Sequence, residues 1–230
     1  GVKIQIKKGY VNAAAKEGLI GSEIRFSKIS VGATENSILA ACLAKGTTTI
    51  KNCAIEPEIK DLTNFLKTAG AKIKWIGKRT LKVEGVKTLK SITYSIMNDR
   101  IEAGTFCVAA CLNGGKLTIK NFEPKIINTE INLLKKIGAK IKTTKNTLQI
   151  KGPKKIRSLD FLKTGEYPNF PTDLQAQIMV LLIRANGKST IEENIFENRY
   201  MHVQELKRLG AKINTKGNKA LIEGTDNLEG

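Results

Sequence analysis

The sequence has 230 residues, of which 41% are hydrophobic and 26% charged, the balance of an ordinary globular protein. No apolar run approaches the roughly 18–20 residues of a membrane-spanning helix, and no basic-then-apolar segment opens the chain, so we expect a cytoplasmic protein and neither a membrane nor a secreted one. The formal charge of +18 permits an anionic partner, but lysines occur throughout the sequence, which favours scattered solvated side chains over one nucleic-acid-binding patch.

One pattern recurs about every seventy residues and divides the sequence into three copies, numbered in chain order. The tetrapeptide Gly-Ala-Lys-Ile occurs at residues 70–73, 138–141 and 210–213. Upstream, ACLAKGTTTIKN at 41–52 resembles ACLNGGKLTIKN at 110–121, and RANGKSTIEEN at 184–194 is a looser third version. Because separate landmarks keep the same order, we infer a repeated structural unit.

Each copy is predicted to begin with a short strand, EIRFSKIS in the first and SITYSIM in the second. An Ala/Leu/Cys-rich buried helix, a glycine turn and a β-branched strand such as TTTIKN follow. The second helix is amphipathic, and the glycine of Gly-Ala-Lys-Ile comes just past its end, where a left-handed backbone is common. Two more strands, AKIKWI and TLKVEG in copy one, give the order β-α-β-α-β-β and predict an α/β fold.

Polar residues gather where the first helix of each copy is predicted to begin: SVGATEN, NDRIEAGT and FPTDLQAQ. Ser30, Asp99 and Thr172 are good helix-capping types, although helix N-termini also bind phosphates and carboxylates. Capping does not explain Arg100 or Arg199, because a cation at a helix start opposes the helix dipole. Each arginine therefore predicts an anion, which is either a partner carboxylate or a ligand phosphate.

The motifs SVGATEN, EPEI, DRIEAGTF, FPTDLQAQ and IFENRYMHV together resemble those of bacterial UDP-N-acetylglucosamine enolpyruvyl transferases, also called carboxyvinyltransferases, from end to end of the chain. The resemblance implies an inside-out α/β barrel fold of the EPSP synthase type, with two domains of three β-α-β-α-β-β units each. About three of those six units would be present. Residues 1–97 would be the last unit of the first domain and residues 98–230 two units of the second. The N- and C-terminal parts of the same enzyme would then be missing.

The resemblance implies that the enzyme transfers enolpyruvyl from phosphoenolpyruvate to the 3-hydroxyl of UDP-N-acetylglucosamine, through a tetrahedral intermediate and with release of phosphate. This reaction is the first committed step of peptidoglycan precursor synthesis, and so serves cell-wall biogenesis, cell shape and cell division. No metal or organic cofactor is implied. The family's reactive loop, which carries a cysteine or an aspartate, would lie in the absent part, so we expect the isolated chain to be inactive.

Two residues receive catalytic roles from the resemblance: Asp173 would be the general base, or the group that aligns the sugar hydroxyl, and Arg199 would stabilise phosphate and the charge of the intermediate. The remaining residues would bind substrate or support the cleft. The substrate-binding residues would be Lys28, Ile29, Ser30, Val31, Gly32 and Ile195, together with Asp173, and the supporting ones Glu56, Asp99 and Glu102.

Two alternatives stay open. The enolpyruvyl transferase of aromatic amino-acid synthesis shares the architecture and the donor but acts on shikimate phosphate. A basic nucleic-acid-binding module could also be built from related units, as in RNA terminal phosphate cyclase. The sequence disfavours nucleic acid because only 5% of its residues are aromatic and it carries no RNP motif.

The four cysteines are predicted to be reduced thiols of the core. Cys107 and Cys111 lie four residues apart in the apolar run FCVAACL, and neither Cys42 nor Cys53 lies in a segment that resembles the family's reactive loop. The single histidine, His202, is expected to begin a helix as a packing or capping residue. With only one histidine, the sequence predicts no Cys/His metal site.

Overall fold

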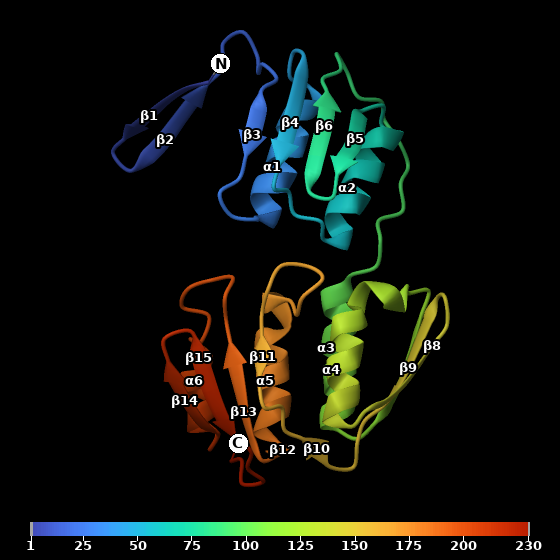
Figure 1. The fold of residues 1–230 in the computed structure, drawn as a ribbon, viewed down its shortest axis with the longest axis vertical. Helices are drawn as coiled ribbons and strands as arrows, with labels where there is room; N and C mark the ends of the chain where they lie inside the picture. Colours follow the sequence, from blue (N-terminus) through green and yellow to red (C-terminus); the bar gives the residue numbers. More distant parts are fainter. Residues whose placement is uncertain (1, 230) are drawn as a thin grey trace. The chain divides into compact units, whose positions relative to one another are not determined.

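A computed structural model describes residues 2–229 of the chain (Figure 1). The chain divides into two compact units, Gly1–Met97 and Asn98–Gly230, called unit 1 and unit 2 below. Each unit has its own hydrophobic core and is described by itself. The assignment of the units to two domains of a six-unit enzyme stays a prediction.

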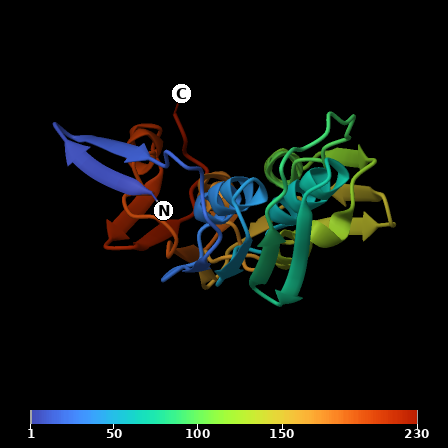
Figure 2. The same ribbon diagram turned by 90° about the horizontal axis from the view of Figure 1, so that it is seen from above.

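Unit 1 contains copy one and has the predicted element order. The elements are β3 (Glu23–Arg25), α1 (Val31–Cys42), β4 (Thr47–Lys51), α2 (Pro57–Thr68), β5 (Lys72–Gly77) and β6 (Thr80–Glu84). The sheet has the order β3-β4-β6-β5, in which β3 and β4 are parallel and the other pairs antiparallel. Alternate residues of β4 and β6, such as Ile50 and Leu81, are buried, and both helices cover this one face (Figure 2).

Unit 2 contains copies two and three. Copy two consists of α3 (Arg100–Leu112), β7 (Lys116–Lys120), η1 (Pro124–Ile127), α4 (Asn128–Ile137), β8 (Lys140–Thr143) and β9 (Thr147–Lys151). Copy three consists of β11 (Leu162–Lys163), η2 (Thr172–Leu174), α5 (Gln175–Ile183), β13 (Lys188–Glu192), α6 (Val203–Arg208), β14 (Lys212–Lys216) and β15 (Lys219–Glu223). The strands β10 (Ile156–Arg157) and β12 (Ala185–Asn186) form a short parallel pair between the copies.

The helices of unit 2 lie inside and the sheets outside. The sheets β7-β9-β8 and β11-β13-β15-β14 flank α3 and α5, which contact each other (Figure 1). Cys107 of α3 and Met179 of α5 belong to one core cluster with residues of both sheets. Among residues 2–229 no sheet closes on itself, so the molecule shows part of an inside-out α/β fold and not a closed barrel.

The glycine that follows the second helix of each copy has the predicted left-handed backbone. Gly70, Gly138 and Gly210 have φ of +102°, +115° and +92°. The amide of the next alanine donates to a carbonyl five residues back in each copy, at 2.9 Å in copy one and 3.0 Å in the other two. This shared bond satisfies a carbonyl that the end of the helix would otherwise leave unpaired.

The predicted strand at residues 91–97 is wrong. No strand forms there, and the segment packs against α2: the Tyr94 ring meets the Phe65 ring edge-on at 5.5 Å, and its hydroxyl donates to Asp61 Oδ1 at 2.9 Å. The β-branched and aromatic residues that suggested a strand favour a half-buried surface of any kind, and here α2 provides that surface.

A hairpin that the sequence analysis did not predict opens the described chain. Strands β1 (Lys3–Lys7) and β2 (Tyr10–Ala14) pair with Ile6 opposite Val11. The hairpin resembles the closing hairpin of each copy, since Gly-Val-Lys-Ile at residues 1–4 is a variant of Gly-Ala-Lys-Ile. Ile6 is 78% exposed, however, whereas Leu81 in the closing hairpin of copy one is fully buried.

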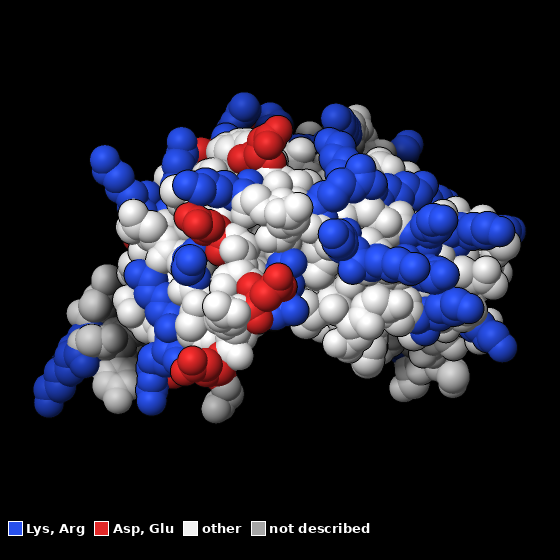
Figure 3. All heavy atoms as spheres, turned by 90° about the horizontal axis from the view of Figure 1, so that it is seen from below, with Lys and Arg blue, Asp and Glu red and all other residues white. Residues whose placement is uncertain are grey.

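All four cysteines are free and buried, as predicted. Burial raises the pKa of Cys107 to about 12, helped by Cys111 and Glu130, and raises that of Cys111 to about 11. Lysine and arginine side chains spread over the face drawn in Figure 3, with acidic side chains among them over part of it. In the described part of the chain, no helix is long and apolar enough to cross a membrane.

Candidate active-site residues

The turn η2 carries Asp173 and is held by its apolar neighbour. Leu174 is 1% exposed and packs against α3, where a Cβ atom added to Gly104 would lie 2.5 Å from Leu174 Cδ1. The absence of a side chain at Gly104 therefore lets η2 approach α3 closely. With Leu174 directed inward, the Asp173 side chain remains outside and is 57% exposed.

Asp173 and Arg199 form an ion pair. Arg199 Nη2 lies 2.6 Å from Asp173 Oδ1, and Arg199 Nε donates to Thr172 Oγ1 at 3.2 Å. The guanidinium also lies 5.2 Å from the centre of the Phe196 ring. The planar fork of Arg199 thus contacts two consecutive residues of η2, and this fixes its orientation in a way that a lysine could not.

Glu193 supports both segments of the site and was not among the residues predicted from the sequence. This carboxylate is 3% exposed. One oxygen accepts the amides of Ile195 and Phe196 at 2.8 and 3.2 Å, and the other accepts the Thr172 hydroxyl at 2.9 Å. Thr172, predicted as a helix cap, is therefore not one, because its hydroxyl bonds to Glu193 and Arg199 instead.

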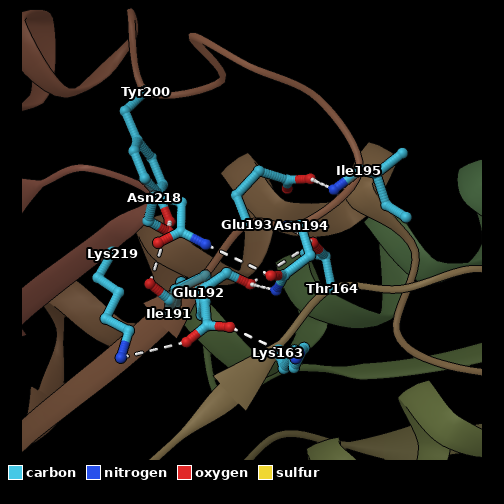
Figure 4. Close-up of polar contacts among 10 residues, drawn as sticks. All are labelled: Lys163, Thr164, Ile191, Glu192, Glu193, Asn194, Ile195, Tyr200, Asn218 and Lys219. Atoms are coloured by element: carbon cyan, nitrogen blue, oxygen red, sulfur yellow. Dashed lines mark hydrogen bonds and ion pairs between the residues drawn. The ribbon is translucent and has the colours of Figure 1, made fainter.

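The neighbouring carboxylate points the other way. In Figure 4, Glu193 reaches toward Ile195, while Glu192 reaches toward Lys163 and Lys219, at 3.5 and 3.3 Å. Successive residues of an extended strand face opposite sides, which separates the two carboxylates. Burial by itself would raise the pKa of Glu192, but bonds to Asn194 and Lys219 and the nearby lysine charges outweigh it and lower that pKa.

In copy two, Asp99 caps α3 as predicted and accepts the amides of Ile101 and Glu102 at 2.7 and 3.1 Å. Glu102 is exposed in the first turn of the helix. Arg100 is buried, with a nitrogen 4.0 Å from Glu130 and its guanidinium 5.7 Å from the Tyr167 ring centre. Burial raises the pKa of Glu130 to about 6, although its own backbone and the Arg100 charge oppose that shift.

Unit 1 carries the substrate-binding residues predicted between Lys28 and Gly32. Ser30 caps α1 as predicted and accepts the Ala33 amide at 3.2 Å. Thr34 donates to the Ser30 carbonyl at 2.7 Å and accepts the Ala54 amide at 3.0 Å, which ties the start of α1 to the segment before α2. Lys28 and Gly32 are exposed, and Ile29 and Val31 are half-buried against the core.

Glu56 precedes α2 in unit 1 and is 5% exposed. Together with Glu58 it acts on Glu35 of α1: burial first, then the charges of Glu58 and Glu56, raise the pKa of Glu35. The supporting role predicted for Glu56 stays a prediction, as do the roles of Asp99 and Glu102.

Three of the predicted residues come together within unit 2. Asp173 and Arg199 pair directly, and Ile195 is held by Glu193, which bonds to Thr172 beside them. Arg199 does not open a helix, because α6 begins at Val203 after the cap His202. A hollow of about 650 Å³ in unit 2 contains none of the predicted residues, since it lies where α3 and α5 end, beside Asn113 and Arg184.

The fold is that of two solved enolpyruvyl-transferase structures. The crystal structure of the enolpyruvyl transferase NikO from Streptomyces tendae matches with a TM-score of 0.86, at 20% identity over 97% of this chain and 55% of that one. EPSP synthase from Acinetobacter baumannii matches with a TM-score of 0.66, at 20% identity over 98% of this chain and 54% of that one. At such identities the likeness shows the fold.

The family follows from the sequence as a whole. The model of EPSP synthase (3-phosphoshikimate 1-carboxyvinyltransferase) matches residues 1–230, and the chain belongs to this family. It is 61% identical over 229 residues to a UDP-N-acetylglucosamine 1-carboxyvinyltransferase of Pelagibacter ubique and 49% identical over 230 residues to one of Caldanaerobacter subterraneus. Both alignments cover all of this chain and 55% of the relative, so the chain spans about half the length of these curated relatives. The predicted resemblance and fold class are confirmed.

Proposed function

We propose that the protein of which this chain forms part transfers the enolpyruvyl group of phosphoenolpyruvate to the 3-hydroxyl of UDP-N-acetylglucosamine. The observation that carries the proposal is the Asp173–Arg199 pair beside Ile195, in a chain 61% identical to an enzyme named for that sugar nucleotide. A cytoplasmic location and a part in peptidoglycan synthesis, cell shape and cell division follow from the same proposal.

In the proposed reaction the sugar hydroxyl adds to C2 of phosphoenolpyruvate, and a proton adds to C3. Loss of that proton and of phosphate then gives the enolpyruvyl ether. Asp173 takes up the hydroxyl proton or aligns the hydroxyl, and Arg199 balances the negative charge of the phosphate. The Asp173–Arg199 pair is more than a third exposed, so solvent weakens it and substrate groups can replace one partner at a small cost.

The nucleotide in this proposal binds to two segments. Lys28, Ile29, Ser30, Val31 and Gly32 supply a cation and a helix N-terminus in unit 1, the type of site that suits a diphosphate. By resemblance, Ile195 also contacts the nucleotide, and Glu56, Asp99 and Glu102 are supporting residues. The 230-residue chain alone is expected to bind substrate without turnover, because by resemblance the reactive loop lies in another part of the enzyme.

A thermal-shift experiment on the 230-residue chain tests the proposal. At ten times its dissociation constant, UDP-N-acetylglucosamine should add about 1.4 kcal/mol to the free energy of unfolding, which raises the melting temperature by about 3–5 °C. Asp173→Asn and Arg199→Leu should reduce the shift. The control Asp226→Asn, which breaks an exposed Arg184 ion pair elsewhere in unit 2, should keep it. Stabilisation by shikimate 3-phosphate, without any by UDP-N-acetylglucosamine, would overturn the proposal.

A further inference from the structure

Glu193 occupies a position that is apolar in the other two copies. The amides of Cys53, Phe122 and Glu193 each donate to the carbonyl just before the last strand of their own copy, at 3.0, 3.1 and 2.8 Å. The three residues are therefore structural equivalents. Cys53 and Phe122 are 0% and 2% exposed and belong to the cores. Only copy three, which carries the Asp173–Arg199 pair, has a carboxylate at this point.

A carboxylate in such a place is costly unless hydrogen bonds satisfy it. Glu193 accepts three: from the amides of Ile195 and Phe196, and from the Thr172 hydroxyl. The amides belong to the loop that carries Ile195 and Arg199, whereas Thr172 precedes Asp173 in η2. A single buried side chain thus joins the two segments that carry the proposed site residues.

The connection continues to the ion pair. Thr172 Oγ1 donates to Glu193 Oε2 and accepts Arg199 Nε, and Arg199 Nη2 reaches Asp173 Oδ1. Each hydrogen bond in this series fixes the acceptor or donor orientation of the next. No hydrogen bond or ion pair joins Glu193 directly to Asp173 or Arg199, so its polar connection to the pair runs through Thr172.

We propose that Glu193 is a positioning residue of the site, which orients Arg199 through Thr172 and holds the Ile195 amide in place. The inference rests on the proposed function only in that Arg199 and Ile195 are taken as substrate-contacting groups. This positioning role requires that both carboxylate oxygens of Glu193 accept hydrogen bonds and that residue 172 has a hydroxyl group.

The single histidine of the chain gives a readout that needs no substrate. Burial, then the Arg199 charge, lowers the pKa of His202. If Thr172 anchors Arg199, Thr172→Val removes the anchor without changing any charge. The pKa of His202, measured by NMR, should then rise toward the ordinary histidine value. Thr172→Ser keeps the hydroxyl and should keep the parent pKa.

Glu193→Gln tests the other end of the connection. The amide of glutamine offers one acceptor in place of two, so either the Ile195 and Phe196 amides or the Thr172 hydroxyl lose their acceptor. Hydrogen exchange at these amides and at Arg199 Nε–H should speed up by about tenfold, the effect of one hydrogen bond of about 1.4 kcal/mol. The matched control Glu192→Gln, on the opposite face of the strand, should leave all these signals unchanged.

Loss of orientation should also weaken binding of UDP-N-acetylglucosamine by about tenfold in Thr172→Val and Glu193→Gln, but not in Thr172→Ser or Glu192→Gln. The inference is overturned if Thr172→Val leaves both the His202 pKa and the Arg199 Nε–H exchange as in the parent. Should the parent fail to bind the sugar nucleotide, the proposed function is wrong. The His202 and Arg199 signals would still decide whether Glu193 positions the pair.

Discussion

Arg100 and Arg199 show how differently two similar residues can be used. The sequence predicted an anion for each and left open whether it was a carboxylate or a ligand phosphate; the partners are Glu130 and Asp173. The Arg100–Glu130 pair is buried, so solvent and salt screen its charges little. The Arg199–Asp173 pair lies partly in solvent, which suits a guanidinium that exchanges partners.

The buried Arg100–Glu130 pair should make the free energy of unfolding depend on pH. The pKa of Glu130 is about 6 in the folded chain and 4.5 in the reference state, because burial disfavours its charged form. The folded state thus holds the proton more tightly, and this stabilisation is complete below pH 4.5 and lost as the pH rises through 6. The loss should be about 2 kcal/mol.

Glu130→Gln should remove that part of the pH dependence. Urea unfolding followed by circular dichroism at pH 4.5 and 7 measures it as the difference between parent and variant. Equal pH dependence in the two proteins would contradict the raised pKa of Glu130, whatever the variant does to stability at a single pH.

At the scale of elements, the glycine after α2 closes the helix and fixes the turn into β5. Gly70 has φ of +102°, and an added Cβ atom would meet no atom within 4 Å. The strain from Gly70→Ala is therefore conformational and not steric. We expect a loss of about 1–2 kcal/mol in the free energy of unfolding of unit 1.

Trp75 is the single tryptophan and lies in β5, so its fluorescence during urea unfolding reports on unit 1. Gly77→Ala in the same strand is the matched control, because its backbone lies outside the left-handed region and its nearest contact would be an ordinary 3.6 Å. The control should change stability by less than about 0.5 kcal/mol. An equal loss in both variants would show that the backbone at Gly70 is not the cause.

The local sequence pattern predicted those elements whose conformation depends mainly on residues close in sequence. It failed where contacts between residues distant in sequence determine the conformation. Apolar periodicity located α2, and the recurring glycine located its end. Residues 91–97 have strand-like composition, yet α2 decides their conformation. Thr172 has a capping side chain, yet Glu193 and Arg199 engage it.

Across the whole molecule, the seventy-residue repeat predicted the α/β class, and the family resemblance predicted the inside-out arrangement found in unit 2. The repeat also carried a sequence signal for Glu193 that was not used. Copy three has Glu-Glu at residues 192–193, whereas the equivalent pairs are Asn-Cys in copy one and Asn-Phe in copy two. The hydrogen bonds that join Ile195, through Glu193 and Thr172, to the Arg199–Asp173 pair could not be predicted, since they depend on how a loop folds back on η2.

The cysteines allow each unit to be followed separately. Cys42 and Cys53 lie in unit 1, and Cys107 and Cys111 in unit 2, all buried. Because burial disfavours their thiolates, native-state alkylation at pH 8 should be slower than in the unfolded chain at all four cysteines, and about a hundredfold slower or more at Cys107 and Cys111. Mass spectrometry of the labelled peptides measures this. Rapid labelling of any one thiol in the native protein would contradict its burial.

An amide chemical-shift map of the 230-residue chain titrated with UDP-N-acetylglucosamine tests the proposed substrate residues together. We expect the largest shifts at Ser30, Val31 and Gly32 in unit 1 and at Ile195 in unit 2, and we expect Arg199→Leu to weaken binding in the titration. Shifts confined to other surfaces, or a response to shikimate 3-phosphate and not to the sugar nucleotide, would contradict the proposal.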